Sequence, residues 1–479
     1  VKILDYFIQQ RVNTKRAFFI SWLLIFLAWI PGLIATYPGI YAYDSVFQMT
    51  YYTTGKILLH HPLIHTYLLG FCVSTLGNFL GSRELGMLIY SLFQMLCLSS
   101  AFAFIIAYMS KRKVTGIIKL SFLFLFMFFP VNALLSFSAT KDVLYSALFA
   151  LMVLMFTLVA EKQNLLYNNK FLILLIIISV LGMAFRNQGI YVFVFGMLWG
   201  MIVLRKHWKR LLIVFISVTL LFAVYSGPIT ILCGGVKSDN LREMMSVPCM
   251  QLSRAMLLAK EQLTEEEKQK IEDYVPEYEA YASYQGISDS MKRSFNSNKF
   301  KENPIDFLYL WISVGLKTPM SYVDAFARLT IGLWYPDMNY RDESAFHPYW
   351  EYKSTEQNQG TTKWIIVDRK TPEGMKWLSD FYYKLTYTNS YQKIPVVSML
   401  FSSGAACWGM LIYIIWCIYE RRYKYLFPAS FVFGLWLTLL LGPVVLYRYV
   451  YPIIMTVPIF IGCAITETLT KIKKEEREY

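Results

Sequence analysis

The stretch AFFISWLLIFLAWIPGLIAT, residues 17–36, decides the fold, because it is almost entirely apolar and contains no charged residue. A helix needs roughly 20 such residues to cross a hydrocarbon core about 30 Å thick. Similar runs recur along the chain, in which 56% of the 479 residues are hydrophobic and 16% are charged, whereas soluble domains carry about 25% charged residues. The sequence therefore predicts an all-α polytopic membrane protein. We expect its first helix to be retained, because no small-residue cleavage site follows it.

The hydropathy pattern predicts a bundle of about ten transmembrane helices. They are expected at residues 17–36, 85–109, 115–136, 142–160, 169–185, 188–204, 210–232, 394–418, 427–446 and 449–468. The fifth run is short for a span. The prediction that the fifth and sixth runs form two successive spans is therefore the least regular part of this pattern.

The distribution of Lys and Arg orients these helices. Basic clusters lie at both ends of the chain and in alternate loops, within residues 2–16, 111–113, 162–170, 205–210, 421–424 and 471–474. Loops rich in Lys and Arg remain cytoplasmic. We therefore expect a multi-pass protein of the plasma membrane with both termini in the cytoplasm. This pattern also accounts for the net charge of +14 without a nucleic-acid partner.

Two long segments remain on the outer side, and they divide the chain. Residues 1–232 form a transmembrane module of seven spans with a first outer loop at 37–84, residues 233–393 form an extracytoplasmic, mostly helical domain, and residues 394–479 form a module of three spans. In the domain, Thr264 and Glu267 predict a capping box. The stretch IDFLYLWISVGL (305–316) predicts a packed or interfacial helix that Thr318-Pro319 ends.

Several functional classes are disfavoured by what the sequence lacks. The spans contain almost no charged residue in their interiors, which argues against a proton- or ion-coupled transporter. There is no GxxxxGK[ST] loop for an ATP-driven motor, and no CxxC pair for a zinc ribbon. Of the seven cysteines, Cys233 and Cys249 share one outer segment and could form a disulfide.

Polar and charged residues gather instead at the outer ends of the predicted spans. They are Asp44, His60, His61, His65, Lys141, Asp142, Arg186, Asn187 and Arg448. In the folded protein they would lie near one membrane surface. Several cations and one spare carboxylate suggest a site for a phosphate carried on a lipid, with the carboxylate free for chemistry.

Three of these elements carry a family resemblance. They are YAYD ending at Asp44, HHPL at residues 60–63, and RYVYP at residues 448–452. With them the chain resembles the GT-C superfamily of integral-membrane glycosyltransferases, which take a sugar from a polyprenyl-phosphate donor. The stretches SATKD (138–142), SVPCMQLSRAM (246–256) and LWYPD (333–337) are similar to a poorly described subgroup from Gram-positive bacteria.

The resemblance implies a catalytic role for Asp44. As a general base, its carboxylate would take the proton of an acceptor hydroxyl that attacks the anomeric carbon. The structural alternative is an Asp that caps the helix starting at Ser45.

Four residues are predicted to bind the donor phosphate, namely Arg448, Arg186, Lys141 and His61. Arg matches phosphate oxygens with two parallel hydrogen bonds, and the alternative for Arg448 is an Arg that extends along the membrane interface. Lys141 and Asp142 could also form a local pair at a helix start, which is the interpretation we favour for Asp142.

The remaining predicted contacts involve the acceptor. His60, His65, Trp334, Tyr335, Gln251 and Arg254 are the candidates. The two aromatic residues, with nearby Tyr340, would form a sugar-stacking platform, and an aromatic belt or core is the alternative. Gln251 and Arg254 are explained equally well by helix packing.

We expect no cofactor and assign no metal ligands. The single acid at Asp44 departs from the paired acidic motif of several relatives. His61 and His65 are four residues apart and can share a helix face, so a divalent metal held by them with Asp44 remains the alternative.

The resemblance thus implies an inverting glycosyltransferase. The expected partners are a monosaccharide on undecaprenyl phosphate, an acceptor glycan on the cell surface or on a lipid, and the bilayer. One alternative is a flippase or transporter of lipid-linked glycans, which predicts a polar path through the spans. Others are a ligase that moves a whole oligosaccharide or polymer, and a non-enzymatic assembly partner.

Overall fold

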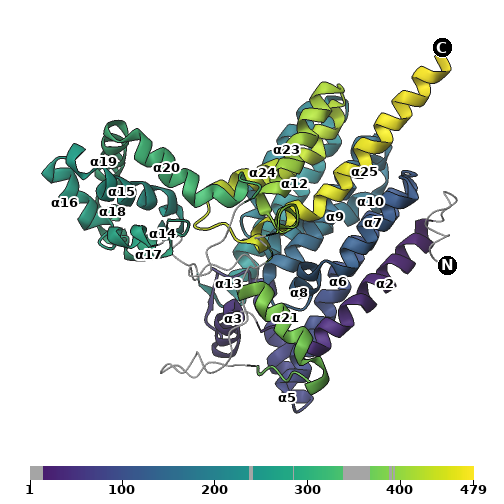
Figure 1. Ribbon diagram of the computed structural model, residues 1–479, viewed down its shortest axis with the longest axis horizontal. Coiled ribbons are helices and arrows are strands. Elements are labelled where there is room, and N and C mark those ends of the chain that lie inside the picture. The colour runs from purple at the N-terminus through teal and green to yellow at the C-terminus, as the bar shows by residue number, and fades with distance from the viewer. Residues whose placement is uncertain are drawn as a thin grey trace.

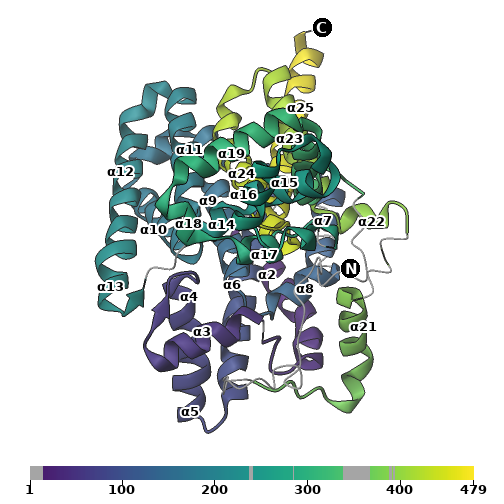
Figure 2. The ribbon, with the colours of Figure 1, turned by 90° about the vertical axis from the view of Figure 1, so that its left-hand side faces the viewer.

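The computed structural model describes residues 14–41, 43–236, 241–283, 285–337, 367–387, 391 and 394–478. This part of the chain is almost entirely helical. Its two named strands, β1 (Ile57–Leu58) and β2 (Gly235–Val236), form one short parallel pair. The all-α expectation is confirmed, and Figures 1 and 2 show a long helical bundle with a smaller helical lobe beside it.

The bundle consists of long apolar helices from both halves of the chain. They are α2 (Thr14–Ala35), α6 (Arg83–Lys111), α7 (Gly116–Phe128), α8 (Pro130–Ser136), α9 (Lys141–Glu161), α10 (Asn169–Phe185), α11 (Gly189–Val203), α12 (Trp208–Val224), α23 (Ser403–Tyr419), α24 (Leu426–Leu440) and α25 (Tyr447–Glu478). Helix α2 begins and α25 ends on the same side of the bundle (Figure 1).

Six of the described helical segments are long and apolar enough to cross a membrane. The bent pair of α7 and α8 raises this number to seven if it forms one broken span. Pro130, at the start of α8, accounts for the break, because proline cannot continue the hydrogen bonding of the preceding helix. The expected spans at 169–185, 188–204 and 394–418 correspond to the shorter helices α10, α11 and α23. The protein is thus a polytopic helical protein suited to a membrane.

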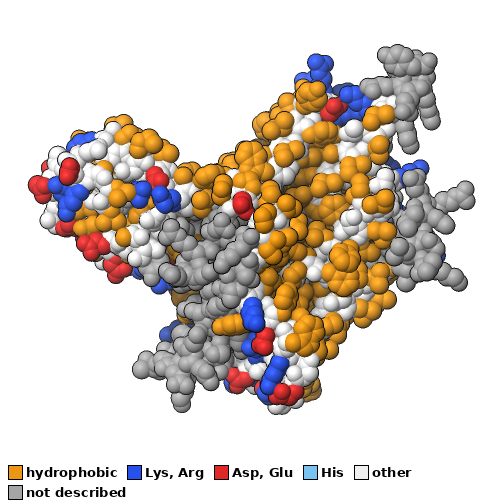
Figure 3. Space-filling model, in the orientation of Figure 1, with side chains coloured by type: hydrophobic (Ala, Val, Ile, Leu, Met, Phe, Trp, Pro, Cys, Tyr) orange, Lys and Arg blue, Asp and Glu red, His pale blue; other side chains and the backbone are white. Residues whose placement is uncertain are grey.

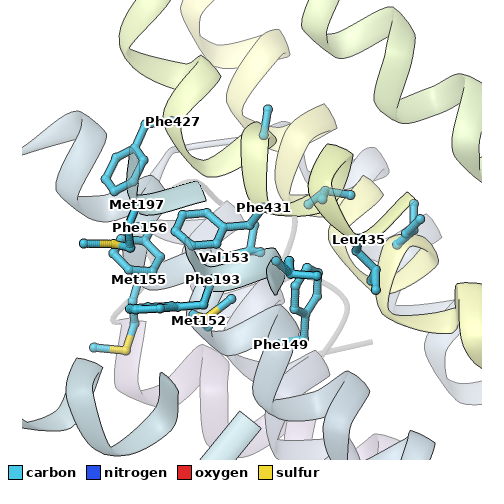
Figure 4. Packing of buried hydrophobic residues seen from close by; sticks show 14 of the residues in the cluster. Phe149, Met152, Val153, Met155, Phe156, Phe193, Met197, Phe427, Phe431 and Leu435 are labelled. Atoms are coloured by element: carbon cyan, nitrogen blue, oxygen red, sulfur yellow. The ribbon is translucent and has the colours of Figure 1, made fainter. Parts of the chain in front are cut away.

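The main core lies where α9, α11, α24 and α25 meet. Figure 4 shows the rings of Phe156, Phe193, Phe427 and Phe431 among methionine and leucine side chains. Gly196 and Gly200 of α11 make this packing possible, because a Cβ at either position would overlap the rings of Phe431 and Phe427. Small residues let helices approach closely, which replaces the hydrophobic driving force that lipid does not supply.

A second core joins α2, α6, α7 and α8 to the middle of α25. Trp29 of α2 is fully buried there, packs on Phe102 and donates its indole N–H to the Phe126 carbonyl at 3.1 Å. Helix α21 (Lys376–Tyr387) joins the same core through Tyr382 and Leu385.

The predicted first outer loop folds into short helices. They are α3 (Tyr43–Thr54), α4 (Leu63–Gly70), the π-helical turn η1 (Phe71–Leu76) and α5 (Gly77–Phe79). Pro62 directly precedes α4, consistent with the preference of proline for helix starts. The strand pair β1–β2 ties this segment to the end of α12, where α13 (Thr230–Leu232) lies.

The lobe has a hydrophobic core of its own, formed by residues between Cys249 and Leu329. Its helices are α14 (Leu241–Met244), α15 (Ser246–Leu258), α16 (Glu265–Tyr274), α17 (Asp289–Ser294), α18 (Ser297–Glu302), α19 (Pro304–Lys317) and α20 (Pro319–Thr330). The capping box of Thr264 and Glu267 is confirmed, as is the break between Lys317 and Pro319.

Within the predicted domain at 233–393, α21 packs on the bundle through Tyr382 and Leu385. The open question of a disulfide between Cys233 and Cys249 is answered by the structure, in which the two are not joined. Both are free thiols, and Cys249 is fully buried in the lobe core while Cys233 follows α13.

Candidate functional site

Backbone contacts between two distant segments position Asp44. The Ile40 N–H donates to the Phe137 carbonyl and the Ala139 N–H donates to the Ile40 carbonyl, both at 2.9 Å. The Ser45 hydroxyl donates to the Ala139 carbonyl at 3.0 Å. These contacts bring the first turn of α3 next to the first turn of α9. Asp44 and Lys141, each at the start of its helix, therefore face one another.

Asp44 lies between two cations. Its Oδ2 is 3.5 Å from Lys141 Nζ and 3.5 Å from Arg448 Nη1. The Asp44 side chain retains 20% of its exposure, whereas that of Arg448 retains 7%. The carboxylate is therefore reachable from solvent while the guanidinium behind it is nearly buried.

Asp142 forms the second half of the cluster and is 1% exposed. Its Oδ1 accepts from Arg186 Nη1 at 3.3 Å, its Oδ2 accepts from the Thr140 hydroxyl at 3.2 Å, and Arg448 Nε lies 3.6 Å from Oδ2. Thr140 also caps α9 by accepting from the Asp142 N–H. Arg448 thus connects both carboxylates, and this bridging position of Asp142 was missed by the sequence interpretation, which treated it as a local helix-start residue.

Aromatic rings hold the guanidinium groups. The Tyr449 ring lies 5.0 Å from the Arg186 guanidinium carbon and 5.1 Å from that of Arg448. Arg186 also lies 5.5 Å from the centre of the Tyr145 ring. Cation–π contacts of this kind strengthen when the cation is removed from water. Tyr449 lies within the RYVYP stretch that the sequence analysis singled out. No sequence pattern predicted that Tyr145 would contact Arg186.

The charges around Asp44 control its protonation. Burial alone would raise the pKa of Asp44, but the positive charges of Lys141 and Arg448 outweigh burial and hold the pKa well below its usual range. Burial and the nearby Lys141 ammonium lower the pKa of His61 to about 2. His61 is therefore neutral, and its Nδ1 accepts from Lys141 Nζ at 3.0 Å.

The other two histidines of this segment have different surroundings. His65 is fully buried, with Nδ1 donating to Gln48 Oε1 at 3.0 Å and Nε2 lying 2.7 Å from the Tyr90 hydroxyl. The Tyr90 hydroxyl donates to Gln94, whose amide donates to the carbonyls of residues 135, 136 and 138. His65 thus belongs to a buried network that supports the segment next to Asp44. His60 is exposed and stacks edge-on against His61.

The lobe is attached to the loop that precedes α25. Burial and Lys141 lower the pKa of His60, and the charges of Glu243 and Lys292 in the lobe also act on it. Ser288 of the lobe donates both its N–H and its hydroxyl to the Pro443 carbonyl at 3.0 Å. Pro443 lies in the loop that leads to Arg448, so the lobe is attached directly beside the cluster.

The structure places four predicted residues elsewhere. Gln251 accepts from the Trp311 indole at 2.9 Å inside the lobe, and Arg254 pairs with Asp324 at 2.5 Å. The Trp334 carbonyl accepts a hydrogen bond from the Trp408 indole at 2.7 Å, and the Tyr335 backbone lies against Gly404 in the first turn of α23. None of these described contacts involves Asp44 or its cations. Tyr340 lies outside the described residues.

An apolar recess opens beside the cluster between α9, α10 and α11. It is shallow, with a volume of about 10 Å³, which is about enough for one water molecule. Its walls are formed by Tyr145, Leu148, Phe149, Met152, Ser179, Gly182, Met183, Gly189, Val192 and Phe193. Tyr145 belongs both to the recess and to the cluster, and its buried hydroxyl has no hydrogen-bond partner in the described part of the chain. A charged site and an apolar recess therefore share one side chain.

The arrangement can bind an anion and move a proton. Lys141, Arg186 and Arg448 supply three cations, and Asp44 supplies a carboxylate at the accessible edge. Within the described ranges, no group of three or more His, Cys, Asp or Glu side chains is placed to hold a metal ion. The surrounding residues suit an anionic group attached to an apolar chain, because charge and apolar surface are adjacent.

Comparison with known proteins gives a family for the chain. Residues 53–478 match a family model described as a family of unknown function, DUF6020. The matched range includes His61, Lys141, Asp142, Arg186 and Arg448, and begins after Asp44. Neither a curated protein nor a solved structure matches the chain. With most of its length covered by this one model, the chain belongs to the DUF6020 family.

Proposed function

We propose that this protein is an inverting glycosyltransferase of the membrane. It would transfer a monosaccharide from undecaprenyl phosphate to a glycan on the outer cell surface or on a lipid. The observation that carries the proposal is the position of Asp44, which is 3.5 Å from both Lys141 and Arg448 at the accessible edge of a buried charged cluster. The GT-C resemblance of the sequence supplies the reaction class.

The cations support binding of the lipid phosphate. Arg448 and Arg186 are held by Tyr449, and both face Asp142. Arg presents two parallel N–H groups to phosphate oxygens, which Lys cannot do. Lys141 would contribute a third positive charge from the Asp44 side. Three cations face two carboxylates here, so the cluster keeps one net positive charge for an anion.

The apolar surface around the recess supports contact with the isoprenoid chain. Its walls are apolar and begin at Tyr145, whose ring contacts Arg186. A phosphate bound at the cations would therefore place the first isoprene units next to this recess. In this proposal α10, α11 and α23 also cross the membrane, which gives ten spans with both termini in the cytoplasm. The basic loops support that orientation through the positive-inside rule.

The proposed reaction uses Asp44 as the base. The acceptor hydroxyl oxygen attacks the anomeric carbon, the bond from that carbon to the phosphate oxygen breaks, and undecaprenyl phosphate leaves. The hydroxyl proton passes to Asp44. A carboxylate with a lowered pKa is a weak base, but a phosphate bound by Lys141 and Arg448 would offset their charge and raise the pKa of Asp44. Donor binding would therefore activate the base.

The lobe is the proposed acceptor-binding part. Ser288 fixes it to the loop before Arg448, and the charges of Glu243 and Lys292 in the lobe act on His60. An acceptor bound along the lobe would thus end near the accessible edge of Asp44.

The decisive experiment compares surface glycan from bacteria that carry the intact gene, a deletion, or the Asp44→Asn variant. Composition and linkage analysis should show loss of one sugar from an otherwise intact glycan in the last two strains. Purified protein in nanodiscs should also release undecaprenyl phosphate from the donor only when Asp44 is present. A normal glycan in the Asp44→Asn strain would refute the catalytic role. Loss of the whole polymer would favour a flippase or a ligase over sugar transfer.

A further inference from the structure

Helix α19 has two apolar faces, one buried in the lobe and one exposed. Phe307, Leu310 and Val314 are buried in the lobe core. The opposite face is exposed and consists of Ile305, Leu308, Tyr309, Ile312 and Leu316. The spacing of three or four residues places these side chains on one side of the helix. Ile305, Tyr309 and Leu316 each keep more than 70% of their exposure, at 77%, 72% and 78%.

The same exposed surface continues onto α20. Met320 and Val323 are 74% and 59% exposed, and α20 begins two residues after α19 ends. We call the exposed side chains of Ile305, Leu308, Tyr309, Ile312, Leu316, Met320 and Val323 the apolar wing. None of these seven side chains is charged. Contiguous apolar surface of this extent on a folded protein marks an interaction site.

The far end of α20 joins the bundle at a tryptophan-rich level. The Trp436 indole donates to the Leu333 carbonyl at 3.1 Å, and the Trp408 indole donates to the Trp334 carbonyl at 2.7 Å. Leu333 belongs to the turn η7 (Ile331–Leu333) that directly follows α20. Tryptophan is enriched where a membrane protein passes from hydrocarbon to headgroups. The wing therefore extends sideways from the level expected for the membrane interface.

The lobe and the bundle enclose a wide notch, visible at the top of Figures 1 and 3. Figure 3 shows hydrophobic side chains continuing from the bundle across α20 onto the lobe. On the bundle side, α23 exposes Trp408, Ile412, Ile415 and Ile418. Both sides of the notch are thus apolar, and the side formed by α23 belongs to a helix that is apolar enough for lipid contact.

We infer that the lipid bilayer fills this notch. In this arrangement the apolar wing lies on the outer leaflet, with its side chains inserted among headgroups and upper acyl chains. An amphipathic helix parallel to the membrane binds in this way, to a depth of about 5–10 Å. The lobe is then fixed at the membrane surface on two sides, through α20 at the bundle and through the wing at the lipid.

The continuity of the surface favours lipid over a second protein molecule. The spans already hold the chain in the bilayer, so the wing meets lipid at a very high effective concentration. A protein partner would have to cover α19 and α20 while leaving the adjoining flank of α23 to lipid. The inference does not depend on sugar transfer, because no wing residue belongs to the charged cluster.

Photolabelling can test this placement on the full-length protein. The protein is reconstituted in phosphatidylglycerol nanodiscs that contain a phospholipid with a diazirine in its acyl chain, irradiated, digested and analysed by mass spectrometry. Labels are expected on the wing residues of α19 and α20. Helix α12 is the positive reference, because it exposes apolar side chains along a predicted span. Helix α16, on the same lobe, is the negative reference.

A double variant distinguishes insertion of the apolar wing into lipid from nonspecific labelling. The double substitution Leu308→Glu and Leu316→Glu should reduce labelling of α19 and α20 several-fold while α12 labelling stays unchanged. Gln262→Glu, elsewhere on the lobe surface, should leave both unchanged, and so should Asp44→Asn. Thermal unfolding of each variant checks that the lobe core is intact.

Two results would overturn the inference. The first is labelling of α19 and α20 no stronger than that of α16 in nanodiscs where α12 is labelled. The second is a stable dimer in detergent that the double variant abolishes, because the wing would then bind a second copy of the chain.

Discussion

Arg448 Nη1 lies 3.5 Å from Asp44 and its Nε lies 3.6 Å from Asp142, so one guanidinium connects two carboxylates from separate parts of the chain. Asp44 belongs to the segment after the first span, Asp142 to the start of α9, and Arg448 to the first turn of α25. The three segments meet at this end of the bundle. In the proposed function this contact joins the base to the donor phosphate site.

Replacement of Asp44 tests the proposed base. Asp44→Asn keeps the size of the side chain but removes the proton acceptor, and we expect sugar transfer to fall by about 10²–10⁴-fold. The protein should remain folded at the assay temperature but with a lower thermal unfolding midpoint, because Asn cannot form the ion pairs of Asp44 with Lys141 and Arg448. The rate of undecaprenyl phosphate release from the donor measures the effect.

Glu84→Gln is a matched control for that variant. Glu84 is another carboxylate in the first turn of a bundle helix and pairs with Lys370 at 2.6 Å. Its loss should leave transfer within a factor of two. An equal loss of transfer in both variants would mean that the effect of Asp44→Asn is not catalytic.

Arg448 should be needed for both stability and donor binding. Arg448→Met leaves Asp142 with one cation fewer in a buried position, and breaking a buried ion pair costs about 3–5 kcal/mol. Arg448→Lys keeps the charge but loses the forked geometry, so undecaprenyl phosphate binding should weaken at least about tenfold while the fold survives. Titration with undecaprenyl phosphate in nanodiscs and thermal unfolding measure the two effects. Unchanged binding in Arg448→Lys would remove Arg448 from the phosphate site.

Lys141 should control the acid limb of the pH profile. The lowered pKa keeps Asp44 ionised throughout the physiological range, and its pairing stabilises the fold fully above the ordinary carboxyl pKa of about 3.9. This stabilisation is lost as pH falls through the lower folded-state pKa. Lys141→Met removes one cation, so the pKa of Asp44 should rise and the acid limb of kcat/KM should move to higher pH. A profile identical to that of the unmodified protein would exclude Asp44 as the titrating group.

His61 should make the fold less stable in mild acid. Its pKa is lowered to about 2 in the folded protein and is about 6.5 when unfolded, so the unfolded chain takes up the proton first. The free energy of unfolding therefore has its full value above pH 6.5. It decreases as pH falls, by about 2 kcal/mol between pH 7 and 5, because the unfolded state binds the proton and the folded state does not. His61→Gln should show a smaller drop in unfolding midpoint over this range. An unchanged drop would contradict the lowered pKa.

Filling the recess should interfere with a lipid donor. A Cβ at Gly182 would meet the Leu148 side chain at 3.9 Å, so there is room for a methyl group, whereas a larger side chain would occupy the recess. Gly182→Ala should have little effect, whereas Gly182→Leu should reduce transfer from the undecaprenyl donor at least about tenfold. A donor with a short alkyl chain should be much less affected. Gly227→Leu is the control, because a Cβ at Gly227 would meet nothing within 4 Å. If Gly182→Leu reduced transfer equally from the long-chain and the short-chain donor, the recess would not bind the lipid chain.

Much of the fold was predictable because its signals are local. Apolar runs identify the long helices, Thr264 and Glu267 define a capped helix start, and Pro319 separates α19 from α20. Helix α21 packs on the bundle through Tyr382, and nothing in its own sequence specifies that partner.

The candidate site was predictable in its members but not in its connections. Asp44, Lys141, Arg186 and Arg448 could be identified as polar residues at the ends of apolar runs. Their ion pairs could not, since hydropathy gives the length of a helix and not its neighbours. Asp142 appeared to be a helix-start residue and is also the buried partner of Arg186. His65 was predicted to bind the acceptor or its sugar. In the structure its two ring nitrogens are hydrogen-bonded to Gln48 and Tyr90.

The sequence by itself determined that this is a polytopic helical protein with its polar residues at helix ends, because the energetic cost of charge and unpaired backbone in hydrocarbon acts on each segment separately. Only the tertiary structure decided that Asp44 meets Lys141 and Arg448, that Tyr145 joins the charged cluster to an apolar recess, and that one apolar face of α19 is exposed. These features arise from packing between distant segments, which depends on the shapes of both partners and is not encoded in either one alone.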